Sequence, residues 1–298
     1  MNIFVVGAGG FIGSSVAKFL SEHHHTVLGY LQSKDGDLTS SSIPENIDII
    51  VNAAGLLGTP DTDEQMLTRA NTDLPIMLGD YCVKHGKNLI HISTPGVTGL
   101  KVNSTEADSL APWGVYERTK ADAENSLSKQ FTSKPELLTI LRPDFVYGPG
   151  DKHKLQLFKQ VAKGWFPLVG LNGGTLRPTF VLDVCRAVEM SLPGGPLNAG
   201  LFNIGGPNIV TIRELVEIVF RSRETPITSV SFPKLFYRLA LIRGPFKQKP
   251  LPTSRLLPLG EDHYVSTASA ATKGFTSETT IVDGIERTVN WYVEEGLL

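Results

Sequence analysis

Three glycines that follow the first apolar run constrain the fold of this chain more than any other feature. Residues 3–6 are Ile, Phe, Val and Val, and Gly7, Gly10 and Gly13 come directly after them, where a helical pattern begins. A buried strand that enters a glycine-rich turn and then a helix presents free backbone N–H groups at the helix start, where phosphate groups bind. The spacing Gly-x-Gly-x-x-Gly is not met, because position 12 is Ile12. The sequence predicts a loop for a nucleotide phosphate, and the alternative is a glycine-rich turn without a ligand.

Apolar runs and helical segments alternate along the first half of the chain. The predicted elements are strands at Ile3–Val6, Val27–Tyr30, Ile47–Asn52, Leu89–Ser93 and Leu138–Leu141, and helices at Phe11–Leu20, Asp73–His85 and from Val115 to Leu127. Strands that alternate with helices form right-handed βαβ units and a doubly wound parallel sheet. We therefore expect an α/β fold of the Rossmann type. The short serine-rich segment between the second and third strands predicts that its helix is missing or reduced to a turn.

The pattern loosens after about Gly148, where proline, glycine and short elements become frequent. We expect a dinucleotide-binding domain over residues 1–150 and a smaller C-terminal lobe, mainly substrate-binding, over residues 151–298. Phe180–Val188 and Leu201–Gly205 still have the character of core elements, so parts around residues 176–206 are predicted to return to the large domain. An apolar C-terminal helix, Ile285–Val293, is expected to pack on the small lobe.

Composition excludes several classes of protein. The formal net charge of −2 lacks the basic excess of a nucleic-acid-binding protein. Cys82 and Cys185 lie far apart in apolar surroundings, a spacing that suits neither a metal site nor a disulfide framework and favours a reducing compartment. The N-terminus lacks a signal-peptide pattern, and no run of about 18 apolar residues appears. We expect a cytoplasmic protein without a transmembrane segment or a metal, and we interpret His23–His25 as a surface turn.

A tyrosine and a lysine have the spacing of a catalytic pair. Tyr116 and Lys120 share one face of a predicted helix, which Pro112 is expected to start. A lysine cation favours the phenolate and lowers the tyrosine pKa from its usual value near ~10. Ser93 and Thr94 end the fourth predicted strand, at the edge where open α/β sheets bind ligands. We predict that Tyr116 is the general acid or base and that Thr94 orients the substrate oxygen, at a carbon that passes between alcohol and ketone.

The end of the second predicted strand bears on the choice of nicotinamide cofactor. An acid at that place would bind a ribose 2′-hydroxyl, but Tyr30 occupies it and Lys34 lies nearby. The sequence therefore favours NADP over NAD and leaves both open. Asp37 is placed near the adenine edge, with a solvated turn acid as the equal alternative.

Several motifs together resemble the extended short-chain dehydrogenase/reductases of the epimerase/dehydratase group, over nearly the whole chain. They are Gly7–Gly13, Asn52–Gly55, Ser93–Thr94, Tyr116–Lys120, Leu141–Pro143 with Tyr147–Gly150, and Phe202–Gly206. The resemblance implies a homodimeric, NAD(P)-dependent enzyme with a small-molecule substrate. The predicted cofactor contacts are Gly7, Gly10, Phe11, Ile12, Gly13, Lys34, Asp37, Leu38, Asn52, Ala53, Ala54, Asn71, Ser93, Tyr116, Lys120 and Pro143. The predicted substrate contacts are Thr94, Asp144 and Arg177, and for Arg177 a structural role is the equal alternative.

Departures from the family pattern narrow the reaction. Nucleotide-sugar 4,6-dehydratases have an Asp-Glu pair after the threonine, by the same resemblance, and here Pro95 and Gly96 follow Thr94. We therefore do not expect a dehydratase. The middle of the chain resembles nucleotide-sugar epimerases and ketosugar reductases, whereas Pro233–Leu241 and His263–Tyr264 resemble the 3β-hydroxysteroid dehydrogenases. The first hypothesis is a nucleotide-activated sugar as substrate, the second is a hydrophobic alcohol, and the third is a cofactor-binding scaffold without turnover.

A cation-rich segment over residues 231–257 bears on the same choice. It contains no Asp or Glu, and its cations are Lys234, Arg238, Arg243, Lys247, Lys249 and Arg255. Such cations suit a nucleotide diphosphate. With their apolar neighbours they also suit peripheral contact with an anionic membrane surface. A solvated loop with no ligand is the remaining alternative.

Overall fold

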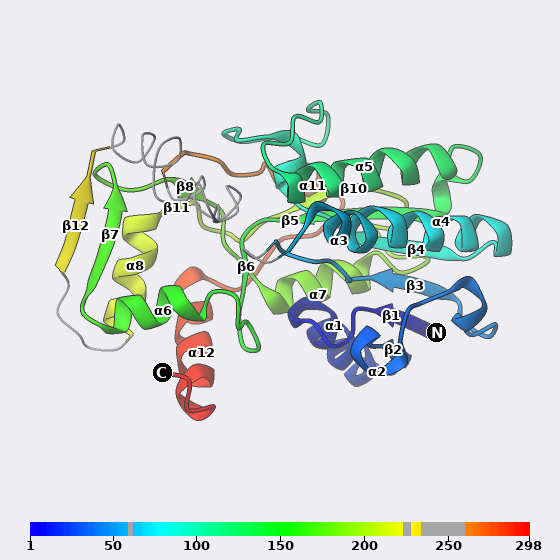
Figure 1. The fold of residues 1–298 in the computed structure, drawn as a ribbon, viewed down its shortest axis with the longest axis horizontal. Helices are drawn as coiled ribbons and strands as arrows, with labels where there is room; N and C mark the ends of the chain where they lie inside the picture. Colours follow the sequence, from blue (N-terminus) through cyan, green and yellow to red (C-terminus); the bar gives the residue numbers. More distant parts are fainter. Residues whose placement is uncertain (59–61, 223–227, 234–259) are drawn as a thin grey trace.

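A six-stranded parallel sheet forms the centre of the molecule in the computed structural model, which describes residues 1–58, 62–222, 228–233 and 260–298 (Figure 1). Its strand order is β10-β5-β4-β3-β1-β2, and every neighbouring pair is parallel. The strands are β1 (Asn2–Val6), β2 (Thr26–Tyr30), β3 (Ile49–Asn52), β4 (Asn88–Ile92), β5 (Leu138–Pro143) and β10 (Gly200–Ile204). The predicted Rossmann-type sheet is confirmed.

Helices cover both faces of this sheet, which explains why its strands are apolar on both sides. On one face α1 (Phe11–Glu22) and α7 (Val181–Met190) cover alternate strand residues such as Ile3 and Val5. On the other face α4 (Leu74–His85) and α5 (Val115–Gln130) cover the intervening ones, such as Phe4 and Val6. Between β2 and β3 the chain forms only α2 (Gln32–Asp35) and η1 (Ser40–Ser42), as the serine-rich segment predicts.

A second apolar core lies beside the sheet, at the left of Figure 1. Its small sheets pair β7 with β12, β8 with β11 and β6 with β9. Its elements are β6 (Val146–Tyr147), α6 (Leu155–Ala162), β7 (Trp165–Val169), β8 (Thr175–Leu176), β9 (Thr179–Phe180), β11 (Val210–Thr211), α8 (Ile212–Arg221), β12 (Thr228–Phe232) and α12 (Ile281–Glu294). As predicted, the C-terminal helix packs there, with Ile285, Val289 and Tyr292 in the core.

The chain alternates between the two cores. It leaves the sheet after β5 to form α6 and β7, returns through α7 and β10, and leaves again for α8. We propose that the boundary near residue 150, with a return around residues 176–206, divides a cofactor domain from a substrate lobe. Tyr292 of α12 donates a hydrogen bond to the carbonyl of Asp151, and this bond ties the end of the chain to that boundary.

The other helical elements of the described residues are short. They are α3 (Glu64–Thr68), η2 (Arg69–Asp73), η3 (Pro95–Thr98), η4 (Pro135–Leu137) and α11 (Ala268–Thr272). Helix α5 begins at Val115, as predicted, and its N-cap is Gly114 rather than Pro112. His23 and His24 are exposed in the turn after α1, as expected.

Membrane-spanning helices, metal-binding groups and the cation-rich segment are considered only for the residues that the structure describes. None of the described helices is both long and apolar enough to cross a membrane. Within the same ranges, no group of three or more His, Cys, Asp or Glu side chains is arranged for a metal ion. The cation-rich segment 231–257 lies outside the described residues except for 231–233.

Candidate active site

The glycine loop between β1 and α1 is shaped by close backbone contacts. Gly7 has a φ of +86°, and a Cβ atom on it would lie 2.6 Å from the backbone nitrogen of Ala54. A Cβ atom on Gly13 would lie 2.1 Å from the carbonyl oxygen of Gly7, so neither position accepts a side chain without a backbone shift. Gly10 is the N-cap of α1 and has no side chain to cap the helix, which leaves the first N–H groups directed at the loop. This cradle fits the pyrophosphate of a dinucleotide.

The end of β2 carries a carboxylate that the sequence interpretation missed. The Asp35 carboxylate accepts a hydrogen bond of 2.8 Å from the backbone N–H of Leu31, because the single turn of α2 brings position 35 back to the strand end. Lys34 is exposed on the same turn. Asp37 accepts a 2.8 Å hydrogen bond from the Gln32 side chain. The preference for NADP was based on the lack of an acid at the end of this strand. Because the Asp35 carboxylate lies there, that reason for preferring NADP is weakened.

Two buried asparagines hold the loop that follows β3. The Asn52 side chain accepts from the Ala54 N–H at 3.1 Å and lies 3.1 Å from Nδ1 of His91. The Asn71 side chain accepts from the Leu56 N–H at 2.8 Å and donates to the Leu56 carbonyl at 3.1 Å. Asn71 lies in η2, a π-helical turn of the kind that often occurs at functional sites. These contacts fix the backbone of residues 53–56 before any ligand binds.

Lys120 reaches the same loop from the other side. Its ammonium donates a 3.0 Å hydrogen bond to the Ile92 carbonyl. A Cβ atom on Gly55 would lie 3.1 Å from the Lys120 ammonium nitrogen. Burial lowers the pKa of Lys120 to about 8, although the nearby Glu124 carboxylate has the opposite effect and raises that pKa. The segment Ala53–Gly55 thus touches Gly7 at one end and Lys120 at the other.

Tyr116 lies one turn before Lys120 on α5, as the spacing predicts. Burial raises the pKa of Tyr116, and the neighbouring Glu117 carboxylate adds to that effect. The phenol is therefore held in its neutral form, and an ionised phenolate needs a cation close to it.

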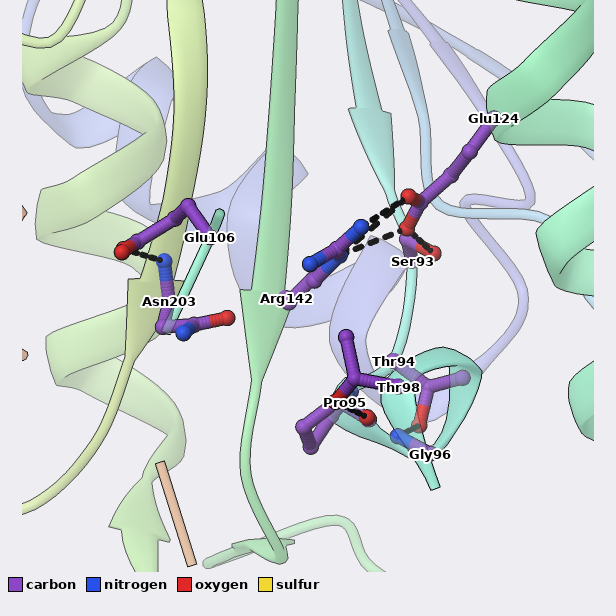
Figure 2. Close-up of polar contacts among 9 residues, drawn as sticks. All are labelled: Ser93, Thr94, Pro95, Gly96, Thr98, Glu106, Glu124, Arg142 and Asn203. Atoms are coloured by element: carbon purple, nitrogen blue, oxygen red, sulfur yellow. Dashed lines mark hydrogen bonds and ion pairs between the residues drawn. The ribbon is translucent and has the colours of Figure 1, made fainter. Parts of the chain in front are cut away.

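Thr94 follows β4 and is the N-cap of η3. Its hydroxyl oxygen accepts from the Gly96 N–H at 3.4 Å, at the long end of the hydrogen-bond range, so its own proton is available to a ligand. Ser93 is differently engaged, because its hydroxyl donates to the buried Glu124 carboxylate, away from Thr94 (Figure 2). Contact between the Ser93 hydroxyl and a cofactor stays a prediction.

Glu117 is a second feature that the sequence interpretation missed. Its side chain is 3% exposed, and burial raises its pKa to about 7. A Cβ atom on Gly96 would lie 2.7 Å from Cγ of Glu117 and 2.9 Å from the Trp113 ring. The sequence shows only that Glu117 directly follows Tyr116. The helix pattern alone does not show that the turn of residues 94–98 covers its carboxyl group.

Asp144 follows β5 and Pro143. Its carboxyl accepts from the backbone N–H groups of Arg177 and Val265, and burial raises its pKa to about 6 despite the nearby His263. Within the described residues, one of its two oxygens has no hydrogen-bond partner. Arg177 donates to the Val265 carbonyl at 2.9 Å and to the Thr267 hydroxyl at 3.0 Å. Arg177 therefore holds residues 265–267 beside Asp144, and a contact between Arg177 and the substrate stays a prediction.

The comparison with family models gives one match to most of the chain. The model of the NAD dependent epimerase/dehydratase family matches residues 3–205, from β1 to the end of β10. This range contains the glycine loop, Asn52, Thr94, Tyr116 and Lys120.

Individual relatives are distant. A 2-alkyl-3-oxoalkanoate reductase of Stenotrophomonas maltophilia is 26% identical, over 96% of this chain and 98% of the relative. A dTDP-4-dehydrorhamnose reductase of Mycolicibacterium smegmatis is 27% identical, over 65% of this chain and 61% of the relative. Among solved structures, the UDP-glucuronic acid 4-epimerase of Bacillus cereus in complex with NAD superposes with a TM-score of 0.79 at 20% identity, over 99% of each chain. At that identity the structural likeness supports the fold alone.

Proposed function

Because this chain belongs to the NAD dependent epimerase/dehydratase family, within the extended short-chain dehydrogenases/reductases, we propose that it is an NAD(P)-dependent oxidoreductase or epimerase of a nucleotide-activated sugar. The reacting centre is a carbon that passes between secondary alcohol and ketone. The observation that carries the proposal is the segment Ala53–Gly55, which contacts the backbone of Gly7 and approaches the ammonium of Lys120. In this proposal, the phosphate-binding loop and the cation of Lys120 lie on two sides of one loop, which Asn52 and Asn71 hold through hydrogen bonds.

Each residue of the candidate active site has its own proposed role in the reaction. When bound, the nicotinamide accepts or returns the hydride. Tyr116 takes or gives the hydroxyl proton, and Thr94 donates to the substrate oxygen and holds it. Lys120 is mostly protonated at neutral pH, since its pKa is about 8, and its charge favours the Tyr116 phenolate that burial disfavours. Pro143 and Asp144 close the site at the end of β5.

The cofactor is proposed to be NAD or NADP. The glycine loop serves either one, and the two differ at the ribose near Lys34 and Asp35. Asp35 favours NAD by accepting a 2′-hydroxyl and Lys34 favours NADP by its charge. Titration of the protein and of an Asp35→Asn variant with NADH and NADPH decides between them: the variant gains affinity for NADPH if Asp35 faces the ribose.

A second candidate substrate has a specific observation in its favour. One relative that matches 96% of this chain is a 2-alkyl-3-oxoalkanoate reductase, and a 2-alkyl-3-oxoalkanoate is an alkyl-chain oxo acid rather than a sugar. A hydrophobic alcohol or ketone is therefore the alternative. Assays with UDP-glucuronic acid, UDP-glucose and dTDP-4-dehydrorhamnose, against a 2-alkyl-3-oxoalkanoate, separate the two classes through the change in nicotinamide absorbance or, for an epimerase, through the sugar product.

The test of the mechanism is the Tyr116→Phe variant. It should lose turnover by a factor of about 10² or more while its cofactor affinity stays nearly unchanged. Tyr81→Phe, which removes a phenol from α4 instead, is the matched control and should keep full activity. A fully active Tyr116→Phe enzyme contradicts the proposal, and failure of the parent protein to bind either cofactor favours a scaffold without turnover.

A further inference from the structure

A cavity of about 460 Å³ lies on the α5 face of the sheet, beside the edge strand β10. The C-terminal half of α5, one face of β5 from Leu138 to Arg142, the beginning of β10, and the segment 106–110 form its walls. Thr94 and Tyr116 belong to the opposite end of these elements, after β4 and at the start of α5. Thr94, Tyr116 and Lys120 are not among the lining residues, so the cavity lies beside the candidate active site. Its volume falls in the range of roughly 300–1,000 Å³ typical of small-molecule sites.

The cavity combines an apolar wall with a polar one. Leu138, Ile140 and Leu201 line it from the two strands, because alternate residues of β5 and β10 face α5. Arg142, the next inward residue of β5, lines it too and is 2% exposed. Asn125, Ser128 and Thr132 form an exposed rim along α5 and its end. Such a surface suits a molecule with an apolar body and one polar group.

The guanidinium of Arg142 is only partly used by the protein. Its Nε and Nη2 atoms donate to the Glu124 carboxylate, with the two Nε contacts at 2.9 and 3.2 Å. Within the described residues, its Nη1 atom is buried and has no hydrogen-bond partner. Figure 2 shows the guanidinium between Glu124 and Ser93 on one side and Asn203 of β10 on the other. A buried donor without a partner is costly, and Arg142 lines the cavity, so an acceptor that reaches Nη1 from the cavity would be stabilised.

The charges around the cavity select a neutral acceptor. Glu124 already compensates the charge of Arg142, and Glu106 and Asp108 add two further carboxylates to the lining. Lys101 pairs with Asp108, which leaves the Glu106 carboxylate as the excess charge. An anionic ligand would meet this negative excess, whereas a carbonyl or amide oxygen accepts from Nη1 without adding charge.

We propose that this cavity binds a small neutral molecule with an apolar body, packed on Leu138, Ile140 and Leu201, and a carbonyl-type oxygen that accepts from Arg142. The ligand itself does not take part in the reaction of the candidate active site. Glu124 joins the two sites, because its carboxylate contacts Arg142 and Ser93 and lies one turn after Lys120 on α5.

The probe for this site is acetanilide, which has a phenyl ring and an amide oxygen and cannot be reduced by a nicotinamide. Ligand-observed NMR should detect saturable binding of acetanilide to the full chain. Ser128→Phe places a ring at the exposed rim and should weaken binding at least about tenfold by filling the cavity. Lys129→Phe, at the next exposed position of α5 and outside the lining, is the matched control and should leave the affinity within about twofold.

Two further probes test the polar part of the proposal. Ethylbenzene keeps the ring without an acceptor and should bind about fivefold more weakly than acetanilide, while phenylacetate adds a charge and should also bind more weakly. Equal binding of acetanilide to the Ser128→Phe variant overturns the location, and no binding up to the solubility limit overturns the site. Equal or tighter binding of ethylbenzene or phenylacetate overturns the assignment of a neutral acceptor.

Discussion

Glu117 shows how one buried side chain gives the protein a pH dependence of its own. Its neighbour Tyr116 faces the proposed reaction, but the Glu117 carboxyl itself is enclosed beside Gly96 and Trp113. In the unfolded chain such a carboxyl ionises near its usual pKa of 4.5, and in the folded protein it does so at about 7. The folded state therefore binds a proton that the unfolded state has already released between these values.

The first prediction follows from this difference in proton binding between the folded and the unfolded state. Glu117 contributes stability that is fully present below about pH 4.5 and is lost as the pH rises through about 7, by up to about 3 kcal/mol. Glu117→Gln removes this contribution, so its free energy of unfolding should fall less between pH 5 and pH 8, measured with denaturant at both values. Asp144 acts with the same sign at lower pH and remains in both proteins. The exposed Glu295→Gln variant is the control, and identical pH slopes for parent and Glu117→Gln would contradict the prediction.

The second prediction concerns the ion pair of Glu124 and Arg142, whose side chains are 4% and 2% exposed. Glu124→Gln leaves a buried guanidinium uncompensated and should lower the free energy of unfolding by about 3–5 kcal/mol. Replacing both residues by Met should cost much less, because no charge is left without its partner.

The exposed pair of Arg118 and Glu64 is the control for that experiment, with side chains 48% and 62% exposed. Glu64→Gln should change the free energy of unfolding by no more than about 1 kcal/mol. Equal losses in Glu64→Gln and Glu124→Gln would show that burial does not set the difference.

At the scale of elements, the unit of β1, the glycine loop and α1 depends on backbone contact rather than on side chains. Gly13→Ala should force the loop away from the Gly7 carbonyl and weaken cofactor binding by more than about tenfold. Gly9→Ala is the matched control in the same loop, since its Cβ atom would meet only the flexible end of Leu31, at 3.1 Å. Calorimetric titration with NADH and NADPH measures both, and equal affinities of the two variants would refute the reasoning.

The elements of the first half of the chain were predictable because their patterns are local. Each buried strand is a short apolar run, and Gly7–Gly13 mark the turn between strand and helix by residue type alone. The start of α5 at Val115 was predicted as well, although Gly114 rather than Pro112 precedes it as the N-cap. Two of the small β-pairs of the second core, β6 with β9 and β8 with β11, are only two residues long and join distant segments, so no local periodicity predicts them.

The candidate site was predictable only in part, for a related reason. Tyr116, Lys120 and Thr94 were proposed from their spacing and from a position at a strand end, and their catalytic roles stay predictions. Asp35 and Glu117 were missed, because their roles depend on a turn that folds back and on a loop that covers a helix. Ser93 was assigned to the cofactor from its position, and only the packing of α5 on β4 shows its hydroxyl directed to Glu124.

At the scale of the whole molecule, the two cores predict an uneven response to cofactor. A ligand that binds only the folded protein suppresses local opening where it is bound. Hydrogen exchange should slow on cofactor addition in residues 7–13, 52–56 and the first turns of α5. It should change little in α8 and in the C-terminal half of α12, which pack in the second core. Uniform protection of both cores, or none in the glycine loop, would contradict the proposed cofactor site.

The alternation of the chain between its two cores also bears on how such a protein can evolve. Because α7 and β10 return to the sheet between α6 and α8, no single cut in the gene would separate the proposed cofactor domain from the proposed substrate lobe. A new substrate lobe cannot arrive as an exchangeable cassette, as it can in proteins whose domains are joined end to end. Specificity has to diverge in place, through point changes and insertions in loops whose two ends are already anchored.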